Sequence, residues 1–343
     1  MPVMKLLAKG LLCCLAAGLS VMLVACGMPR LQPPDPDLCK DGEPVPWVAV
    51  APSVWIWLPE REAEIDIANA GHVMPTSVVV DRGEALVIDP GPSHRHGLRV
   101  LQSLRCRFGA RVTWVLNTHA HPENVMGNSA FAEAQTRGQL RIAASQPTLS
   151  AMQQRCADCL RNLQQRAGVD AMAGTRIVLP DTLLQAGSTL RVGERELQVL
   201  DVVGAHTEGD LLLWDAAPGV LWAGGLIYGR RVPELAQGSL QTWLHALARI
   251  EALPLRELIG ATWSSAGDDG SAPSALTSTR RYLLDLREGA LRAMDAGQLP
   301  QEPGVLPLPA YAGWPGYQER HAFNVMRAWR ELEPLWMEQI PVQ

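Results

Sequence analysis

Hydrophobic positions along the chain alternate between strand-like and helix-like patterns. Apolar runs of strand length occupy residues 78–80, 85–88, 112–116, 197–203, 211–214, 220–223 and 257–261. The first two flank a polar turn at 81–84, which is typical of a hairpin. Apolar residues recur at helical spacing over 96–104, 125–134, 149–167 and 240–250. This interleaving predicts an α/β fold, to which we assign residues 47–270.

The last part of the chain has only helical patterns. One helix is marked by Leu283, Leu286, Leu291 and Met294, and a second by Val325, Trp329 and Leu332. We expect Pro334 to kink or end the second helix, because proline cannot donate the backbone hydrogen bond of a helix interior. Residues 271–343 are therefore predicted to be a helical extension and not a second catalytic domain.

The N-terminal segment has the pattern of an export signal. Two lysines precede a short apolar stretch that ends in Leu-Val-Ala-Cys-Gly at residues 23–27. This ending resembles a bacterial lipobox, which predicts a lipoprotein signal peptide at 1–25, a lipid on Cys26 and a tether at 26–46. Because Gly27 is not an aspartate, we expect anchoring at the periplasmic face of the outer membrane. A plain signal peptide and a buried apolar helix are the alternatives.

Charge excludes one class of partner. The net charge is −5, with 19% charged residues. No basic run is long enough to follow a phosphate backbone, so we expect no nucleic-acid partner. Membrane contact is expected only through the lipid anchor.

Four cysteines remain beyond Cys26, namely Cys39, Cys106, Cys156 and Cys159. An oxidising compartment favours disulfides, and four thiols allow three pairings, which the sequence leaves open. Cys156 and Cys159 form a CxxC on a predicted helix. No thioredoxin-like strand precedes it, so a structural role is favoured over redox catalysis.

Two histidine pairs have the spacing of metal ligands. His119 and His121 follow a predicted strand, and alternate residues leaving a strand point the same way, so both imidazoles can face one metal ion. His94 and His96 stand where a helix should begin, and residues two apart on a helix diverge. We expect that second pair to be a solvated loop.

The setting of the first pair is more informative. Thr118-His119-Ala120-His121-Pro122-Glu123-Asn124 lies between a strand and a helix, and Ala205-His206-Thr207 ends a later strand. This arrangement resembles the metallo-β-lactamase superfamily, an αββα sandwich with the signature HxHxDH and a later histidine, aspartate and histidine. Over residues 70–335 the chain is most similar to the quinoprotein relay system zinc metallohydrolases.

The resemblance assigns roles and also shows departures. His119, His121 and His206 stand where the family has the ligands of its first metal ion. In the second metal site, Glu123 and Asn124 replace the aspartate and histidine, and Gly225 replaces the bridging aspartate. No histidine follows the last strand, where we expect the ring of Trp263 to fill the vacated volume. Neither glycine nor tryptophan can take the place of these ligands.

One zinc ion is therefore the expected cofactor, with three imidazole ligands and an open position for water. Glu123 is the candidate general base, or it only orients the water. The oxyanion would lack its second metal ion, and one of Arg230 and Arg231 could approach the site; a solvated loop is the alternative. Asp89 is either a turn residue or a buried acid beneath the metal. Asp210 is expected to cap a loop.

These features predict a periplasmic single-zinc hydrolase. The family resemblance implies a link to quinoprotein-dependent alcohol oxidation, with a periplasmic quinoprotein dehydrogenase system as the possible partner. The alternative is a catalytically silent member that binds zinc or a partner protein. Neither reading identifies the small-molecule substrate.

Overall fold

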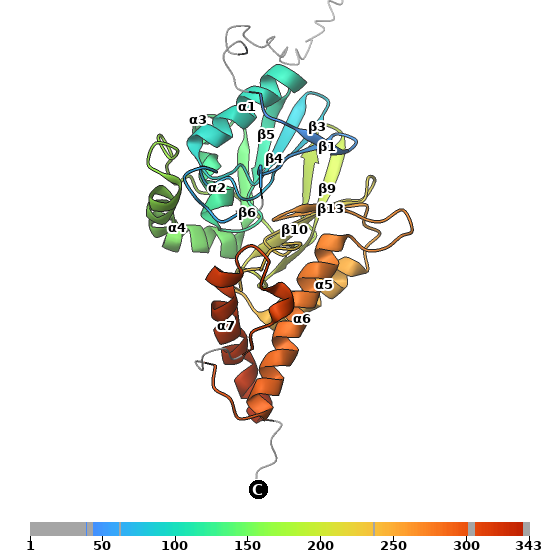
Figure 1. Cartoon of the computed structure of the whole chain (residues 1–343). Coiled ribbons are helices and arrows are strands. Elements are labelled where there is room, and N and C mark those ends of the chain that lie inside the picture. Colours follow the sequence, from blue (N-terminus) through green and yellow to red (C-terminus); the bar gives the residue numbers. More distant parts are fainter. Residues whose placement is uncertain (1–38, 40–43, 62, 236, 301–305, 339–343) are drawn as a thin grey trace, which may run out of the picture. The chain divides into compact units, whose positions relative to one another are not determined.

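The computed structural model describes residue 39 and residues 44–61, 63–235, 237–300 and 306–338 (Figure 1). The predicted signal peptide 1–25, Cys26 and most of the predicted tether lie outside these residues. No helix in the described ranges has both the length and the apolar character that a bilayer crossing requires.

The first sheet has seven strands that are neighbours in chain order. They are β1 (Val48–Ala51), β2 (Val54–Trp57), β3 (Thr76–Asp81), β4 (Glu84–Ile88), β5 (Arg111–Leu116), β6 (Arg141–Ser145) and β7 (Thr182–Leu184). The predicted hairpin is β3–β4, with Val78 opposite Val87. From β4 to β7 the strands are parallel, and helices or long loops connect them.

The second sheet has six strands in the order β13-β12-β11-β10-β9-β8. They are β8 (Thr189–Val192), β9 (Arg195–Val203), β10 (Asp210–Asp215), β11 (Val220–Gly224), β12 (Glu257–Gly260) and β13 (Trp263–Ser265). Strands β10 and β11 are buried throughout, which explains why their sequences are continuous apolar runs and not alternating ones.

Helices cover the outer faces of both sheets. The first group is α1 (His94–Phe108), α2 (Pro122–Val125), the 3-10 turn η1 (Met126–Ala130), α3 (Ala132–Thr136) and α4 (Gln146–Ala167). The second is α5 (Leu240–Glu251), α6 (Ser274–Asp295), the 3-10 turn η2 (Pro309–Tyr311) and α7 (Tyr317–Met337).

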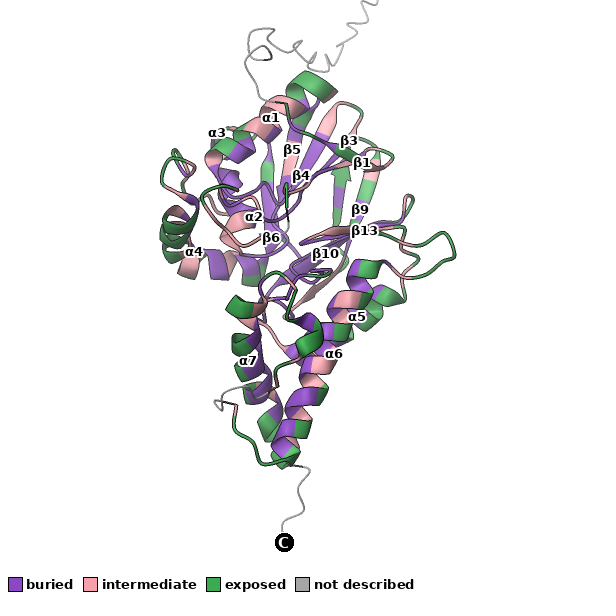
Figure 2. Ribbon diagram, in the orientation of Figure 1, coloured by how far each residue is buried: buried purple, intermediate pink, exposed green. Residues whose placement is uncertain are grey.

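Three clusters of buried apolar side chains fill the space between these layers. One lies between the sheets, with Leu86 and Leu116 from the first and Leu213 and Trp222 from the second. Another joins α1 to the outer face of the first sheet. A third joins α5, α6 and α7 to the second sheet, and the facing surfaces of the elements are buried (Figure 2). The predicted αββα sandwich with C-terminal helices is confirmed.

The two C-terminal helices are part of the fold. Glu331 on α7 accepts hydrogen bonds from Ser239 Oγ and from the amides of Leu240 and Gln241, so it caps the N-terminus of α5. Helix α7 continues through Pro334 to Met337, so the expectation that the proline ends this helix is wrong. Trp336 beyond the proline donates to Asp295 of α6, which holds the last turn in place.

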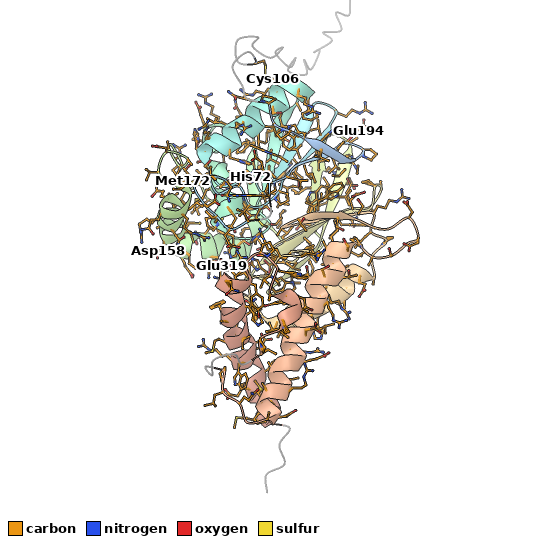
Figure 3. All side chains as sticks on the ribbon, in the orientation of Figure 1. His72, Cys106, Asp158, Met172, Glu194 and Glu319 are labelled. Atoms are coloured by element: carbon orange, nitrogen blue, oxygen red, sulfur yellow. A yellow bond between two sulfur atoms is a disulfide. The ribbon has the colours of Figure 1, made fainter. Side chains whose placement is uncertain are left out.

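The cysteine pairing that the sequence left open is Cys39–Cys106, which joins the predicted tether to α1 (Figure 3). Val45 at the end of that tether is only 3% exposed and packs in the α1 cluster, so the fold begins before residue 47. Cys156 and Cys159 are free thiols on α4. Burial raises the pKa of Cys156 to about 12, as expected of a structural cysteine and not of a redox nucleophile.

Candidate metal centre

The loop after β5 places the first two candidate ligands. Asn117 and Asn128 of η1 exchange side-chain hydrogen bonds of 3.0 and 2.8 Å, which fixes the loop against the following helical segment. His119 is fully buried in this loop, and His121 is the N-cap residue of α2. Both rings therefore lie at the carboxyl end of the first sheet.

A second loop, after β9, supplies His206. The Asp210 carboxylate accepts hydrogen bonds from the amides of Ala205, His206 and Thr207, at 3.2, 2.7 and 2.9 Å. The prediction that Asp210 caps a loop is confirmed. Burial raises its pKa to about 6 despite these bonds. The capped turn brings the His206 ring to the other two.

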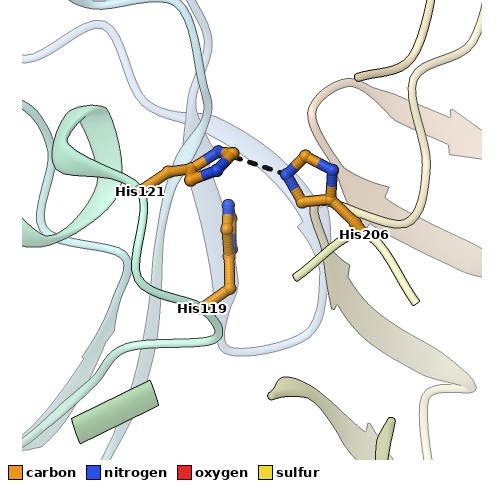
Figure 4. A group of neighbouring side chains, drawn as sticks. All are labelled: His119, His121 and His206. Atoms are coloured by element: carbon orange, nitrogen blue, oxygen red, sulfur yellow. Dashed lines mark hydrogen bonds between the residues drawn. The ribbon is translucent and has the colours of Figure 1, made fainter. Parts of the chain in front are cut away.

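The three imidazoles meet around one point (Figure 4). His206 Nε2 lies 3.1 Å from His121 Nδ1, while His119 Nε2 is buried and has no partner. One nitrogen from each of the three rings lies within 4.8 Å of the others. Three nitrogens at about 2.0–2.1 Å from a tetrahedral zinc ion are separated by roughly 3.4 Å. The predicted meeting of the three histidines is confirmed.

Hydrogen bonds on the outer nitrogens assign the inner ones as ligands. His206 Nδ1 lies 2.7 Å from the carbonyl oxygen of Glu234, so Nδ1 carries the proton and Nε2 has the free lone pair. Thr118 Oγ1 donates its proton to Asp89 at 2.7 Å and must therefore accept one from His119 Nδ1 at 2.9 Å. The lone pair of His119 is again on Nε2.

Asp89 is thus a buried acid behind the first ligand and not only a turn residue. Its second carboxylate oxygen accepts from the Thr118 amide at 2.9 Å, and its backbone has a left-handed φ of 51°. Burial raises its pKa to about 6, against the lowering by Thr118 and Asn124. Through Thr118, Asp89 orients the His119 ring.

Burial also controls the charge of the histidines. It lowers the pKa of His119 and of His206 well below the usual value of 6.5, and the neighbouring His121 lowers both further. Both rings are therefore neutral near pH 7, and neutral imidazole is the form that binds a metal ion.

Glu123 lies in the first turn of α2 with its Oε1 3.8 Å from His121 Nδ1. It borders a cavity of about 310 Å³ that is also lined by His121, Tyr228, Arg231, Glu234 and Arg320. The carboxylate is close enough to the ligand atoms to reach a water molecule among them.

At one position of the expected second metal site, residue 225, the structure leaves no room for a side chain. A Cβ on Gly225 would lie only 2.1 Å from His206 Cδ2, so the ring uses the space that a side chain at residue 225 would need. Asn124 is buried beside Asp89, but neither of its polar atoms makes a hydrogen bond of good geometry. Of the altered positions, only Glu123 offers a carboxylate.

Trp263 does not fill the vacated volume, so that prediction is wrong. The residue pairs with Ile259 across β12–β13, and its indole Nε1 donates to Glu257 at 2.7 Å. Glu257 begins β12 and Gly260 ends it. The metal-site loops lie at the Gly260 end, because Gly260 adjoins Gly224, which in turn adjoins Thr118 and His119. The hydrogen bond to a carboxylate directs the ring away from the histidines.

The other histidine pair is also corrected. His94 and His96 open α1 and are not in a solvated loop. His96 is 6% exposed, stacks on Trp57 at 4.0 Å between ring centroids and lies 3.0 Å from Thr76 Oγ1. A flat aromatic partner from β2, which the local pattern does not reveal, accounts for its burial.

Two functional neighbours were not found from the sequence. Tyr228 is buried with its hydroxyl 3.5 Å from His206 Nε2, and the main chain of Glu234 orients His206. Both contacts are made by the loop after β11, across more than 20 residues, and neither residue belongs to a motif. Of the two arginines considered, Arg231 lines the cavity and Arg230 is exposed.

Comparisons with known proteins agree with this geometry. The family model of the metallo-beta-lactamase superfamily matches residues 71–262. Hydroxyacylglutathione hydrolase of Methylococcus capsulatus is 28% identical over 177 residues, which are 50% of this chain and 54% of that protein. The enzyme of the same name from Nitrosococcus oceani is 32% identical over 150 residues, 43% of this chain and 44% of that one. The chain spans about half the length of these curated relatives.

Solved structures show the same fold. A beta-lactamase domain protein from Burkholderia ambifaria has a TM-score of 0.57 at 18% identity, over 87% of this chain and 91% of that one. The metallo-beta-lactamase FIM-1 from Pseudomonas aeruginosa, in a mono-zinc form, has a TM-score of 0.52 at 16% identity, over 71% and 96%. At these identities the likeness establishes the fold alone.

Proposed function

The chain belongs to the metallo-beta-lactamase superfamily, and from this premise we propose that it is a hydrolase that works with a single zinc ion. The observation that carries the proposal is the convergence of His119 Nε2, His121 Nδ1 and His206 Nε2. Three imidazoles, of which His119 and His206 are neutral and oriented by hydrogen bonds on their outer nitrogens, fit a zinc ion with one open position.

Each residue then has a defined part. A bound zinc ion would supply Lewis acidity and lower the pKa of its water to about 7. Glu123 would take the proton of that water and deliver it to the leaving group. Asp89, through Thr118, would keep His119 in the tautomer that leaves Nε2 free. The cavity beside His121 would hold the acyl substrate.

A catalytically silent protein that binds zinc or a partner is the second candidate. The observation in its favour is the close approach of His206 to Gly225, which leaves no room for a side chain where the resembled family has its bridging aspartate. A missing electrostatic partner for the oxyanion typically costs 10²–10³ in rate. Zinc without turnover would support this candidate.

We further propose that the protein is a lipoprotein on the periplasmic face of the outer membrane, anchored through Cys26. A periplasmic quinoprotein dehydrogenase system is its proposed context. The lipobox-like sequence and the family resemblance support both statements. Labelling of wild type and Cys26→Ser with a fatty-acid probe in a Gram-negative host tests the anchor, since only wild type should be labelled.

The test of the hydrolase uses a panel that contains an ester, a thioester and a lactone; thioesters are included because of the hydroxyacylglutathione hydrolase relatives. Activity should vanish on chelation and return with zinc. Glu123→Gln should lower kcat by about 10²–10⁴, the usual contribution of a general base, with zinc retained. Glu133→Gln, on the exposed side of α3, is the matched control and should leave kcat unchanged. Stoichiometric zinc with no turnover on the whole panel would refute the hydrolase.

A further inference from the structure

Arg231 is a buried cation without an anion. It is 3% exposed, and no carboxylate of the described residues lies within ion-pair distance of its guanidinium. Its Nη1 donates to the Val73 carbonyl at 3.2 Å and its Nη2 to the Met74 sulfur at 3.5 Å. Its Nε is buried and has no partner.

The other arginines around the same cavity are paired. Arg155 forms a two-bond ion pair with Glu208 at 2.8 Å. Arg320 contacts Glu64 at 2.6 Å, and Arg166 lies 3.7 Å from the same carboxylate. The contrast matters because a buried charge without a counter-charge is strongly disfavoured, whereas an apolar side chain of similar size would pack there without that cost.

The free edge of Arg231 has a specific shape. Nε–H and one N–H of Nη2 lie parallel along one side of the guanidinium, the side that binds a carboxylate through two hydrogen bonds. On this side Nε is unpartnered and Nη2 meets only a sulfur, which is a weak acceptor. The opposite nitrogen, Nη1, holds the main chain of Val73 and fixes the group in position.

Arg231 also lies near the histidine cluster. Its guanidinium carbon is 5.0 Å from the centre of the Tyr228 ring, and the Tyr228 hydroxyl is 3.5 Å from His206 Nε2. One aromatic ring thus separates the cation from a candidate zinc ligand. The shared cavity of about 310 Å³ suits a small molecule that reaches both.

We propose that Arg231 binds the free carboxylate of the substrate, so that the preferred substrates are small acyl compounds that carry one carboxylate a few bonds from the scissile carbonyl. The inference rests on the proposed hydrolase function and specifies its substrate class. A monoanion is favoured over a phosphate dianion because Arg231 offers one free guanidinium edge, the other three cavity arginines are paired with Glu64, Glu208 or Glu234, and Glu123 adds a negative charge to the same cavity.

The test measures binding to the metal-free protein, so that no anion can bind through zinc. The probes are monomethyl succinate and its neutral match, dimethyl succinate, in isothermal titration calorimetry. Wild type should bind the monoanion at least tenfold (about 1.4 kcal/mol) more tightly than the diester. Arg231→Met should bind both equally. Arg230→Met, which changes the exposed neighbour, should keep the wild-type preference.

Three results would overturn the inference: no measurable preference in wild type, a preference that survives in Arg231→Met, or one that is lost equally in Arg230→Met. A purely structural Arg231 would lower the thermal stability of Arg231→Met and leave the preference intact. If Arg231→Met does not fold, Arg231→Lys keeps the charge without the parallel N–H pair and should weaken the preference. If the protein hydrolyses none of the test substrates but wild type still prefers the monoanion, the proposed hydrolase function is refuted and the role of Arg231 in anion binding stands.

Discussion

Adding one methyl group at Gly225 should strongly weaken zinc binding. The backbone of Gly225 does not have the left-handed φ that only glycine adopts easily, so the Gly225→Ala chain itself is unstrained. The new Cβ, however, would lie 2.1 Å from Cδ2 and 2.7 Å from Nε2 of His206. Carbon atoms in contact prefer about 3.5–4.0 Å, so the ring must retreat by about 1 Å or more.

A retreat of that size cannot preserve the site. Zinc–nitrogen bonds keep their length within about 0.2 Å, and the His206 ring is held from behind by the Glu234 carbonyl at 2.7 Å. Changes that only misorient a ligand already cost 10–100-fold in metal affinity. We therefore expect Gly225→Ala to bind zinc at least about 100-fold more weakly, and Gly225→Asp not to create a second zinc site.

Competition with a chromogenic chelator measures the affinity, and circular dichroism checks that the variant is folded. Gly204→Ala is the matched control, two residues before His206, because its Cβ would meet its nearest atom, the Glu208 carbonyl oxygen, at an ordinary 3.7 Å. Its zinc affinity should equal that of wild type. A folded Gly225→Ala that binds zinc as tightly as wild type would show that the account of this site is wrong.

Two further predictions concern stability. Burial lowers the pKa of His72 to about 4, so below pH 6.5 the unfolded chain takes up a proton that the folded chain refuses, and stability falls as the pH drops. At pH 5 the loss in the free energy of unfolding amounts to about 2 kcal/mol. Urea unfolding of metal-free protein at pH 7.5 and pH 5 should show a smaller loss of stability at the lower pH for His72→Phe than for wild type. An equal loss in the two proteins would contradict the reasoning. The Cys39–Cys106 bond closes a separation of 67 residues, so replacing both cysteines by serine should lower the free energy of unfolding by about 4 kcal/mol in the chain-entropy model, and an unchanged urea midpoint would contradict it.

Periodicity predicted most of the sandwich because the elements concerned have one clear pattern each. The β3–β4 hairpin and the fully buried β10 and β11 are examples. Strands β1, β2, β6, β7, β8 and β13 have three to five residues each and were not predicted, because so few residues give only a weak period. The course of α7 past Pro334 depends on contacts with α6, which lie outside any local pattern.

The candidate site, too, could be predicted from the sequence only in part. His119 and His121 were predicted from their own spacing, and His206 from the family resemblance. Tyr228 and the Glu234 carbonyl could not be predicted, because a neighbour brought in by a loop has no local signature. Trp263 was assigned wrongly because its position in the sequence says nothing of the Glu257 carboxylate that turns its ring away.

Zinc content combined with X-ray absorption at the zinc edge tests the central claim most directly. The account predicts one zinc ion per chain of purified protein, bound by three imidazole nitrogens at about 2.0–2.1 Å and by one oxygen ligand. Protein that retains no zinc after mild purification, or that binds two zinc ions per chain, would contradict it.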